Sequence, residues 1–130
     1  MKKILIIEDE KFLLEMYQSR FEKDGYQVLT AMSGEKGLKL AQKEKPDLIV
    51  LDILMPGMDG YEVIKKIRGD AQIKEIPILV LSNLGQEEEI KRGLELGAND
   101  YIVKTDLTPS ELIDKVKSME IKVRPTSMTF

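Results

Sequence analysis

Short apolar runs alternate with amphipathic stretches along the whole chain. Five runs, rich in Ile, Val and Leu, predict β-strands, and three of them are continuously apolar rather than alternating. Continuous apolar runs are typical of parallel strands that are covered on both faces, because side chains on either face are then buried. The predicted strands are Ile4–Ile7, Val28–Ala31, Leu48–Leu51, Ile78–Leu81 and Tyr101–Val103.

Between these runs, apolar residues recur at three- and four-residue intervals, which is the spacing of one face of a helix. The helices are predicted at Lys11–Lys23, from Ser33 to before Pro46, at about Tyr61–Arg68, at about Gln86–Leu96 and from Pro109 onward. In the first helix, the residues on this spacing are Phe12, Leu13, Met16, Tyr17 and Phe21. The last helix has the strongest start signal, since Thr108 can cap it and Glu111 completes a capping box.

Strands and helices alternate five times with short connections, and this order predicts one α/β domain with a parallel sheet. No repeat, charge block or low-complexity linker divides the chain. We expect the domain to cover residues 1–122. Residues 123–130 show no periodicity and are expected to form a flexible tail.

The composition of the 130-residue chain restricts its chemistry. Cys and His are both absent, which excludes disulfides, thiolate nucleophiles, imidazole acid–base catalysis and zinc sites built on Cys or His. The chain has 20 Lys and Arg against 23 Asp and Glu, a net charge of −3, which argues against a generic binder of polyanions. Any catalysis must therefore use carboxylates, hydroxyls, lysine or a hard cation.

The first residues do not have the pattern of a targeting signal. Only the short run Ile4–Ile7 separates Lys2 and Lys3 from the acidic residues that follow. This run is far too short for a secretory signal or a membrane span. We therefore expect a cytoplasmic protein with no membrane partner.

Polar residues follow four of the five predicted strands, at the edge where an open parallel sheet binds its ligands. They are Glu8 and Asp9 after the first strand, Asp52 after the third, Ser82 at the end of the fourth and Lys104 after the fifth. Three carboxylates facing one ammonium leave an excess of negative charge, which a divalent cation with oxygen ligands would relieve. The sequence therefore predicts a Mg²⁺ pocket that faces a hydroxyl and an ammonium.

Other functions of α/β proteins lack their motifs here. The chain contains no G-x-G-x-x-G, no G-x-x-x-x-G-K-[ST] and no G-x-S-x-G, which argues against dinucleotide binding, a P-loop and a serine-hydrolase elbow. The acidic connection after the first strand would also repel a bound phosphate. A phosphatase or nuclease built on an Asp-x-Asp pair would need a carboxylate at position 54, where the chain has Leu54.

Taken together, these residues resemble the receiver domain of two-component response regulators, and the single-domain chemotaxis regulators are nearest in size. The resemblance covers about residues 2–118. Its landmarks are Glu8-Asp9, the segment from Pro46 to Gly60 around Asp52, Ser82 after Leu-Val-Leu, and the segment from Gly97 to Lys104. It implies a flavodoxin-like fold, a doubly wound sheet of five parallel strands in the order 2-1-3-4-5 flanked by five helices.

The resemblance also implies roles for the residues at the strand ends. Asp52 would accept a phosphoryl group. Asp9 would bind Mg²⁺ directly and Glu8 through water, with Asp52 and the backbone carbonyl of Leu54 among the other ligands. The metal site would therefore sit beside the phosphorylated carboxylate.

The remaining implied roles concern the phosphoryl oxygens and the response to them. Ser82 and Lys104 would hold these oxygens, and Ser82 and Tyr101 would form the switch. The implied function is a signalling switch that catalyses only its own phosphorylation and dephosphorylation, so we do not expect an enzyme with an external substrate. Added charge of this kind biases a two-state element.

The implied partners are a sensor histidine kinase or phosphotransfer protein as donor and an unidentified downstream protein. The downstream partner would dock near Lys91, Arg92 and Glu95. We expect a monomer, with dimerisation on phosphorylation left open. Direct binding of nucleic acid is not expected, because only about ten residues follow the last predicted helix.

Two residues depart from the family pattern, and two other functions stay open. Thr105 replaces the usual proline after Lys104, where a cis peptide bond before a non-proline residue would cost about 2.5–4 kcal/mol. Asn83 replaces a small residue and could alter water access. Thr105 favours a pseudo-receiver, an interaction module without physiological phosphotransfer. A metal-dependent hydrolase of external phosphoesters is the third hypothesis.

Overall fold

The computed structural model of the protein describes residues 2–123 and contains a five-stranded parallel sheet in the order β2-β1-β3-β4-β5. The strands are β1 (Lys3–Ile7), β2 (Gln27–Ala31), β3 (Leu48–Leu51), β4 (Ile78–Ser82) and β5 (Asp100–Val103). The helices are α1 (Lys11–Lys23), α2 (Gly34–Glu44), α3 (Gly60–Arg68), α4 (Glu87–Leu96) and α5 (Pro109–Val123), with a short 3₁₀ helix, η1, at Lys104–Asp106. The predicted fold class is therefore confirmed.

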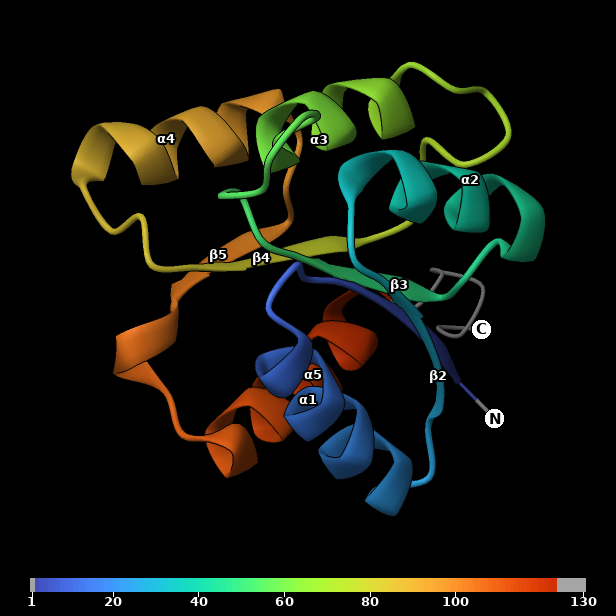
Figure 1. The fold of residues 1–130 in the computed structure, drawn as a ribbon, viewed down its shortest axis with the longest axis vertical. Helices are drawn as coiled ribbons and strands as arrows, with labels where there is room; N and C mark the ends of the chain where they lie inside the picture. Colours follow the sequence, from blue (N-terminus) through green and yellow to red (C-terminus); the bar gives the residue numbers. More distant parts are fainter. Residues whose placement is uncertain (1, 124–130) are drawn as a thin grey trace.

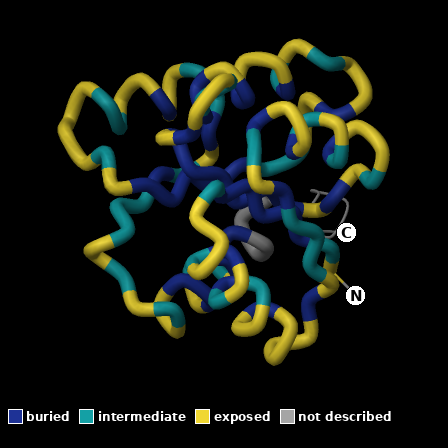
Figure 2. Tube along the Cα trace, in the orientation of Figure 1, coloured by how far each residue is buried: buried dark blue, intermediate teal, exposed yellow. Residues whose placement is uncertain are grey.

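The helices form a layer on each face of the sheet. Helices α2, α3 and α4 cover one face, and α1 and α5 cover the other (Figure 1). Alternate residues of the strands enter the two resulting cores: Leu5 and Ile7 of β1 lie on the α3 side, and Ile4 and Ile6 lie on the α1 side. The three inner strands β1, β3 and β4 are accordingly the most continuously buried part of the described chain, whereas the edge strands β2 and β5 are only partly buried (Figure 2). This burial on both faces explains the unbroken apolar runs in the sequence.

The structure corrects the predicted inner face of α1. Leu14, Tyr17 and Phe21 are buried, whereas 79% of Phe12 is exposed. At 100° per residue, Phe12 lies about 160° from Leu14 around the helix axis, on the opposite side. Helical spacing alone could not separate the two faces, because apolar residues occur on both.

The capping signals of the later helices are confirmed. Ser33 accepts a hydrogen bond from the Lys36 amide at 3.2 Å, at the start of α2. Thr108 and Glu111 form the reciprocal capping box of α5: the Thr108 hydroxyl accepts from the Glu111 amide at 3.2 Å, and the Glu111 carboxylate accepts from the Thr108 amide at 2.9 Å. The hydrogen bonds from Thr108 lower the pKa of Glu111.

The predicted domain limit and the tail at residues 123–130 remain predictions, since residues 124–130 lie outside the described residues. Within residues 2–123, no helix combines the length and the apolar character that a membrane span requires.

Candidate phosphorylation and metal site

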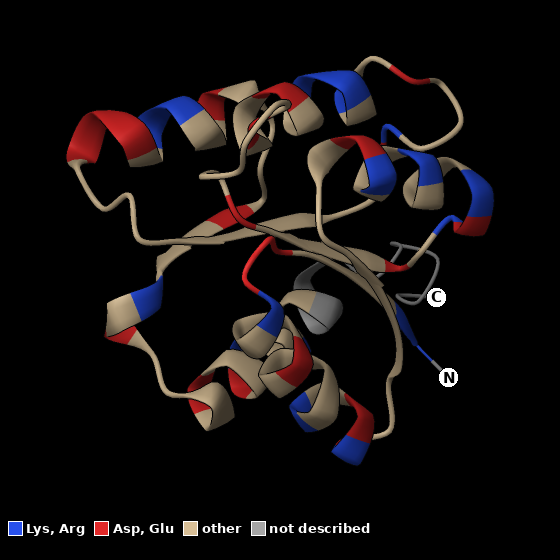
Figure 3. Cartoon of the chain, in the orientation of Figure 1, with Lys and Arg blue, Asp and Glu red and all other residues tan. Residues whose placement is uncertain are grey.

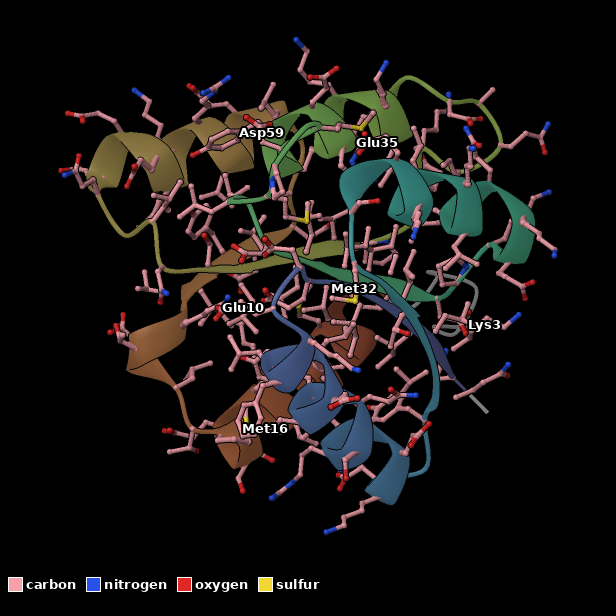
Figure 4. The ribbon with its side chains drawn as sticks, in the orientation of Figure 1. Lys3, Glu10, Met16, Met32, Glu35 and Asp59 are labelled. Carbon is pink, nitrogen blue, oxygen red and sulfur yellow. The ribbon has the colours of Figure 1, made fainter. Side chains whose placement is uncertain are left out.

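The candidate site lies at the carboxyl ends of β1 and β3, which are neighbours in the sheet. The acidic segment after β1 comes close to the acidic residue after β3 between the two helix layers (Figure 3). Glu10, which directly precedes α1, lies on the α1 side of the sheet, and Asp59, which directly precedes α3, lies on the other side (Figure 4). The strand ends that carry the site therefore lie between the starts of α1 and α3.

The loop between β3 and α3 fixes the backbone around Asp52. Gly57 adopts a φ of +75°, in the left-handed region that favours glycine. The Gly60 amide donates to the Ile53 carbonyl at 2.9 Å, and a Cβ at Gly60 would collide with the Asp52 carbonyl oxygen. Asp59 caps α3 by accepting from the Glu62 amide at 3.0 Å. The glycine lets α3 start directly against the strand end that carries Asp52.

Three carboxylates converge at this edge. One carboxylate oxygen from each of Glu8, Asp9 and Asp52 lies within 4.8 Å of the others. Glu8 and Asp52 are buried, with 2% and 6% of the residue exposed, and Asp9 is half-buried. Oxygen ligands in such a group suit a hard divalent cation. The predicted acidic cluster is confirmed.

Lys104 neutralises part of this charge. Its Nζ donates to Glu8 Oε1 at 2.8 Å and to Asp52 Oδ2 at 3.0 Å, and only 8% of its side chain is exposed. Burial by itself lowers the pKa of Lys104, but the hydrogen bonds to the two carboxylates outweigh burial, so the pKa is raised. Lys104 therefore stays charged in the site at neutral pH.

Burial has the opposite consequence for Glu8. It raises the pKa of the Glu8 carboxyl, and the hydrogen bonds from Lys104 and from the Glu10 amide offset only part of this effect. The nearby Asp52 carboxylate raises the pKa further. Glu8 is thus a carboxylate whose charge is costly where it lies, which is the electrostatic condition that a bound cation relieves.

The Thr105 position does not turn Lys104 away from the site. None of the described peptide bonds is cis, so the Lys104–Thr105 bond is trans. Lys104 nevertheless contacts both carboxylates. Thr105 and Asn83 line a cavity of about 320 Å³ beside Lys104, between α1 and the start of α5.

The other predicted site residues form a neighbouring group. The fully buried Ser82 hydroxyl accepts a hydrogen bond from the Leu84 amide at 3.3 Å. The Leu84 carbonyl in turn accepts from the Tyr101 hydroxyl at 2.6 Å. Tyr101 is buried, so its ring lies inside the molecule. The structure therefore joins Ser82 and Tyr101 through one peptide unit, that of Leu84, which the sequence did not single out.

Leu54 lies at the mouth of the site. Its amide donates to Asp52 Oδ1 at 3.3 Å, and 54% of the residue is exposed. The donated hydrogen bond orients the Asp52 carboxylate. The proposed role of the Leu54 carbonyl as a metal ligand remains a prediction.

The sequence of this chain matches the model of one protein family over most of its length. The family model described as the response regulator receiver domain matches residues 4–117. The chain belongs to the response regulator receiver domain family. The receiver fold carries the acidic cluster and the lysine at the strand ends, as the resemblance in the sequence implied.

Curated relatives of this receiver domain are longer proteins. The chain is 45% identical over 118 residues to the alkaline phosphatase synthesis transcriptional regulatory protein PhoP of Bacillus subtilis, covering 91% of this chain and 48% of that protein. It is 42% identical over 118 residues to a probable transcriptional regulator of Cyanophora paradoxa, with the same coverage. The chain thus spans about half the length of the curated relatives it matches.

Solved structures share the whole receiver fold. A chemotaxis protein of Vibrio cholerae is 33% identical with a TM-score of 0.85, covering 91% of this chain and 98% of that one. The beryllofluoride-activated N-terminal receiver domain of RstA from Klebsiella pneumoniae is 31% identical with a TM-score of 0.84, covering 95% and 100%.

Proposed function

We propose that this receiver domain is a phosphorylation-activated switch in which Asp52 accepts a phosphoryl group. The observation that carries the proposal is the meeting of Glu8, Asp9 and Asp52 with Lys104 at one edge of the sheet. The donor would be a histidine-phosphorylated sensor kinase or phosphotransfer protein, as membership of the receiver domain family implies.

In the proposed reaction, an Asp52 carboxylate oxygen bonds to phosphorus while the phosphorus–nitrogen bond to the donor imidazole breaks. The released imidazole takes a proton from solvent. The transferring group spreads negative charge over its oxygens, and we assign Lys104 and the Ser82 hydroxyl as the donors that bind them. Water later attacks phosphorus, breaks its bond to Asp52 and restores the carboxylate with release of inorganic phosphate.

The acidic cluster fits a magnesium ion. Glu8, Asp9 and Asp52 offer only oxygen ligands, which Mg²⁺ prefers, and a site with few carboxylates leaves positions for phosphate oxygens. We assign Asp9, Asp52 and the Leu54 carbonyl as its direct ligands and Glu8 as a ligand through water. When bound, Mg²⁺ supplies positive charge to the phosphoryl oxygens.

Lys104 has to exchange one of its contacts in this reaction. In the resting state it bonds Asp52 Oδ2, an oxygen of the group that is to be phosphorylated. Once Asp52 carries the phosphoryl group, Lys104 can bond a phosphoryl oxygen instead, which keeps its positive charge paired. The Thr105 position does not prevent this, since Lys104 already points into the site.

We further propose that the phosphorylated state is passed to an effector outside residues 4–117. Relatives about twice as long as this chain are named transcriptional regulators. A separate partner protein that binds the phosphorylated receiver domain is the alternative effector.

The test is incubation with Mg²⁺ and acetyl phosphate, followed by measurement of intact mass. We expect wild type to gain one phosphoryl group and Asp52→Asn to gain none. Asp47→Asn is a matched control, because Asp47 lies before the same strand at its other end and is exposed. Beryllofluoride binding in the presence of Mg²⁺ gives a second assay that does not depend on a labile adduct.

Two results would contradict the proposal. A folded wild-type protein with neither the adduct nor beryllofluoride binding would indicate a pseudo-receiver. Continuous release of phosphate from added phosphoesters, with no stable adduct, would indicate a hydrolase.

A further inference from the structure

Tyr61 is a buried residue of α3 that none of the site chemistry uses. It lies in the first turn of α3, directly after Gly60, and only 5% of it is exposed. Its hydroxyl donates to the Glu89 carbonyl of α4 at 3.0 Å. The Arg92 guanidinium of α4 lies 4.1 Å from the centroid of its ring. Tyr61 thus binds the first two turns of α4 through both its hydroxyl and its ring.

The same part of α4 covers Tyr101. Helix α4 lies beside α3 on one face of the sheet, over the edge formed by β4 and β5 (Figure 1). A Cβ built on Gly93 would lie 2.9 Å from Tyr101 Cδ2 and 3.9 Å from Tyr61 Cε1. The absence of a side chain at Gly93 therefore lets the ring of Tyr101 pack against α4, with the ring of Tyr61 next to it.

The two phenol groups are neighbours. Burial raises the pKa of Tyr101, and the adjacent Tyr61 hydroxyl adds to this effect, whereas a smaller contribution from the Ser82 hydroxyl lowers it. Burial also raises the pKa of Tyr61. Both hydroxyls are therefore neutral donors at physiological pH, and each has a backbone acceptor: Leu84 for Tyr101 and Glu89 for Tyr61.

These two acceptors belong to one continuous segment. Leu84 lies in the loop after β4, and Glu89 lies in the first turn of the helix that this loop leads into. Because the segment is continuous, we expect a shift of the first turn of α4 away from α3 to move the Leu84 carbonyl away from the Tyr101 hydroxyl. The bonds that hold it there, within the described residues, include both contacts of Tyr61.

We propose that Tyr61 is a positioning residue that holds Tyr101 in its inward orientation by fixing the start of α4. Removal of the Tyr61 hydroxyl frees the first turn of α4, weakens the acceptor that Leu84 presents, and increases the outward population of Tyr101. The proposal rests on the proposed function in one respect, which is that Tyr101 is the residue whose orientation reports the signalling state.

The experiment uses fluorine NMR of the full chain with fluorotyrosine at its four tyrosines, without metal or phosphodonor. Tyr101→Phe assigns the Tyr101 resonance. In Tyr61→Phe, we expect the inward-to-outward ratio of Tyr101 to fall about fivefold, the effect of losing one ordinary hydrogen bond. In Arg92→Gln, where an exposed side chain loses its charge over the Tyr61 ring, we expect a smaller fall of about twofold.

Tyr26→Phe is the matched control, since Tyr26 is equally buried but lies in the core on the α1 side of the sheet. An unchanged Tyr101 resonance in folded Tyr61→Phe overturns the proposal. An equal change in Tyr26→Phe overturns it too, because the effect would then be general loosening. If Tyr61→Phe does not fold, Arg92→Gln provides the test, and an unchanged Tyr101 resonance in that variant overturns the proposal. Beryllofluoride binding by wild type is measured separately, so failure of the switch function is distinguishable from failure of this coupling.

Discussion

At the carboxyl end of the sheet, the Lys104 ammonium lies between two buried carboxylates, whereas at the amino end the Arg68 guanidinium lies among backbone carbonyls. Arg68 Nε donates to the Gly97 carbonyl at 2.9 Å, and Nη1 donates to the carbonyls of Lys74 and Ile76 at 2.9 and 2.7 Å. Its Nη2 donates to Asn99 Oδ1 at 2.9 Å, an oxygen that also accepts from the Ile78 amide.

The two cations therefore have partners of different kinds. A carboxylate can give up a lysine in favour of another cation, or become phosphorylated. A backbone carbonyl cannot change its charge. The rigid fork of Arg68 matches four acceptors, three carbonyls and the Asn99 side-chain oxygen, which come from the loops before β4 and before β5. The carboxyl end of this sheet can therefore change its bonding, whereas the amino end keeps fixed bonds between the loops before β4 and β5.

Removal of Lys104 should produce the largest change. In Lys104→Met without metal, two buried carboxylates lose their cation, and we expect the free energy of unfolding to fall by about 3–5 kcal/mol. Added Mg²⁺ should raise the free energy of unfolding more in this variant than in wild type, because the ion no longer competes with the lysine. Urea unfolding with chelator and with Mg²⁺ measures both. Equal responses of variant and wild type to Mg²⁺ would show that the site does not exchange its cations.

Removal of Arg68 should cost about 3 kcal/mol of unfolding free energy in Arg68→Ala, because partly buried carbonyls are left without donors. Here we expect Mg²⁺ to add no more stability than it adds to wild type. Arg20→Ala is a suitable control, since Arg20 is exposed and bonds only the Ser110 hydroxyl among the hydrogen bonds described. A loss in Arg20→Ala as large as that in Arg68→Ala would mean that the carbonyl contacts carry no particular weight.

The pH dependence of the carboxyl end should be the smallest effect. The folded protein raises the pKa of Glu8 above its ordinary value of 4.5, so it binds a proton at higher pH than the unfolded chain does. The Glu8 contribution to stability therefore increases as the pH falls from neutral through the raised pKa, and levels off below 4.5. Chemical unfolding of wild type and Glu8→Gln between neutral pH and below pH 4.5 measures the contribution of Glu8 to the free energy of unfolding. A difference that stays constant with pH would contradict the raised pKa.

Much of the acidic end was predictable from the chain. Glu8, Asp52, Ser82 and Lys104 are polar residues at the ends of apolar strand sequences, so they can be recognised in the sequence. Because the strands are parallel, these residues lie at one edge of the sheet. The strand order came from the family resemblance, because alternation alone does not specify it.

The amino end and the interior of α4 were not predictable in the same way. Arg68 and Tyr61 bond backbone carbonyls, and a carbonyl is present at every residue, so no sequence pattern marks these contacts. Phe12 was placed on the wrong face because its spacing suits either side of α1. What the sequence does not reveal is thus the contact of a side chain with a distant backbone.

The bond between Lys104 and Glu8 joins positions 96 residues apart. During synthesis, Glu8 and Asp52 emerge from the ribosome long before the ammonium that neutralises them. A nascent polypeptide that ends short of η1 lacks the cation of this site, so the acidic edge cannot reach its native bonding before Lys104 has been synthesised.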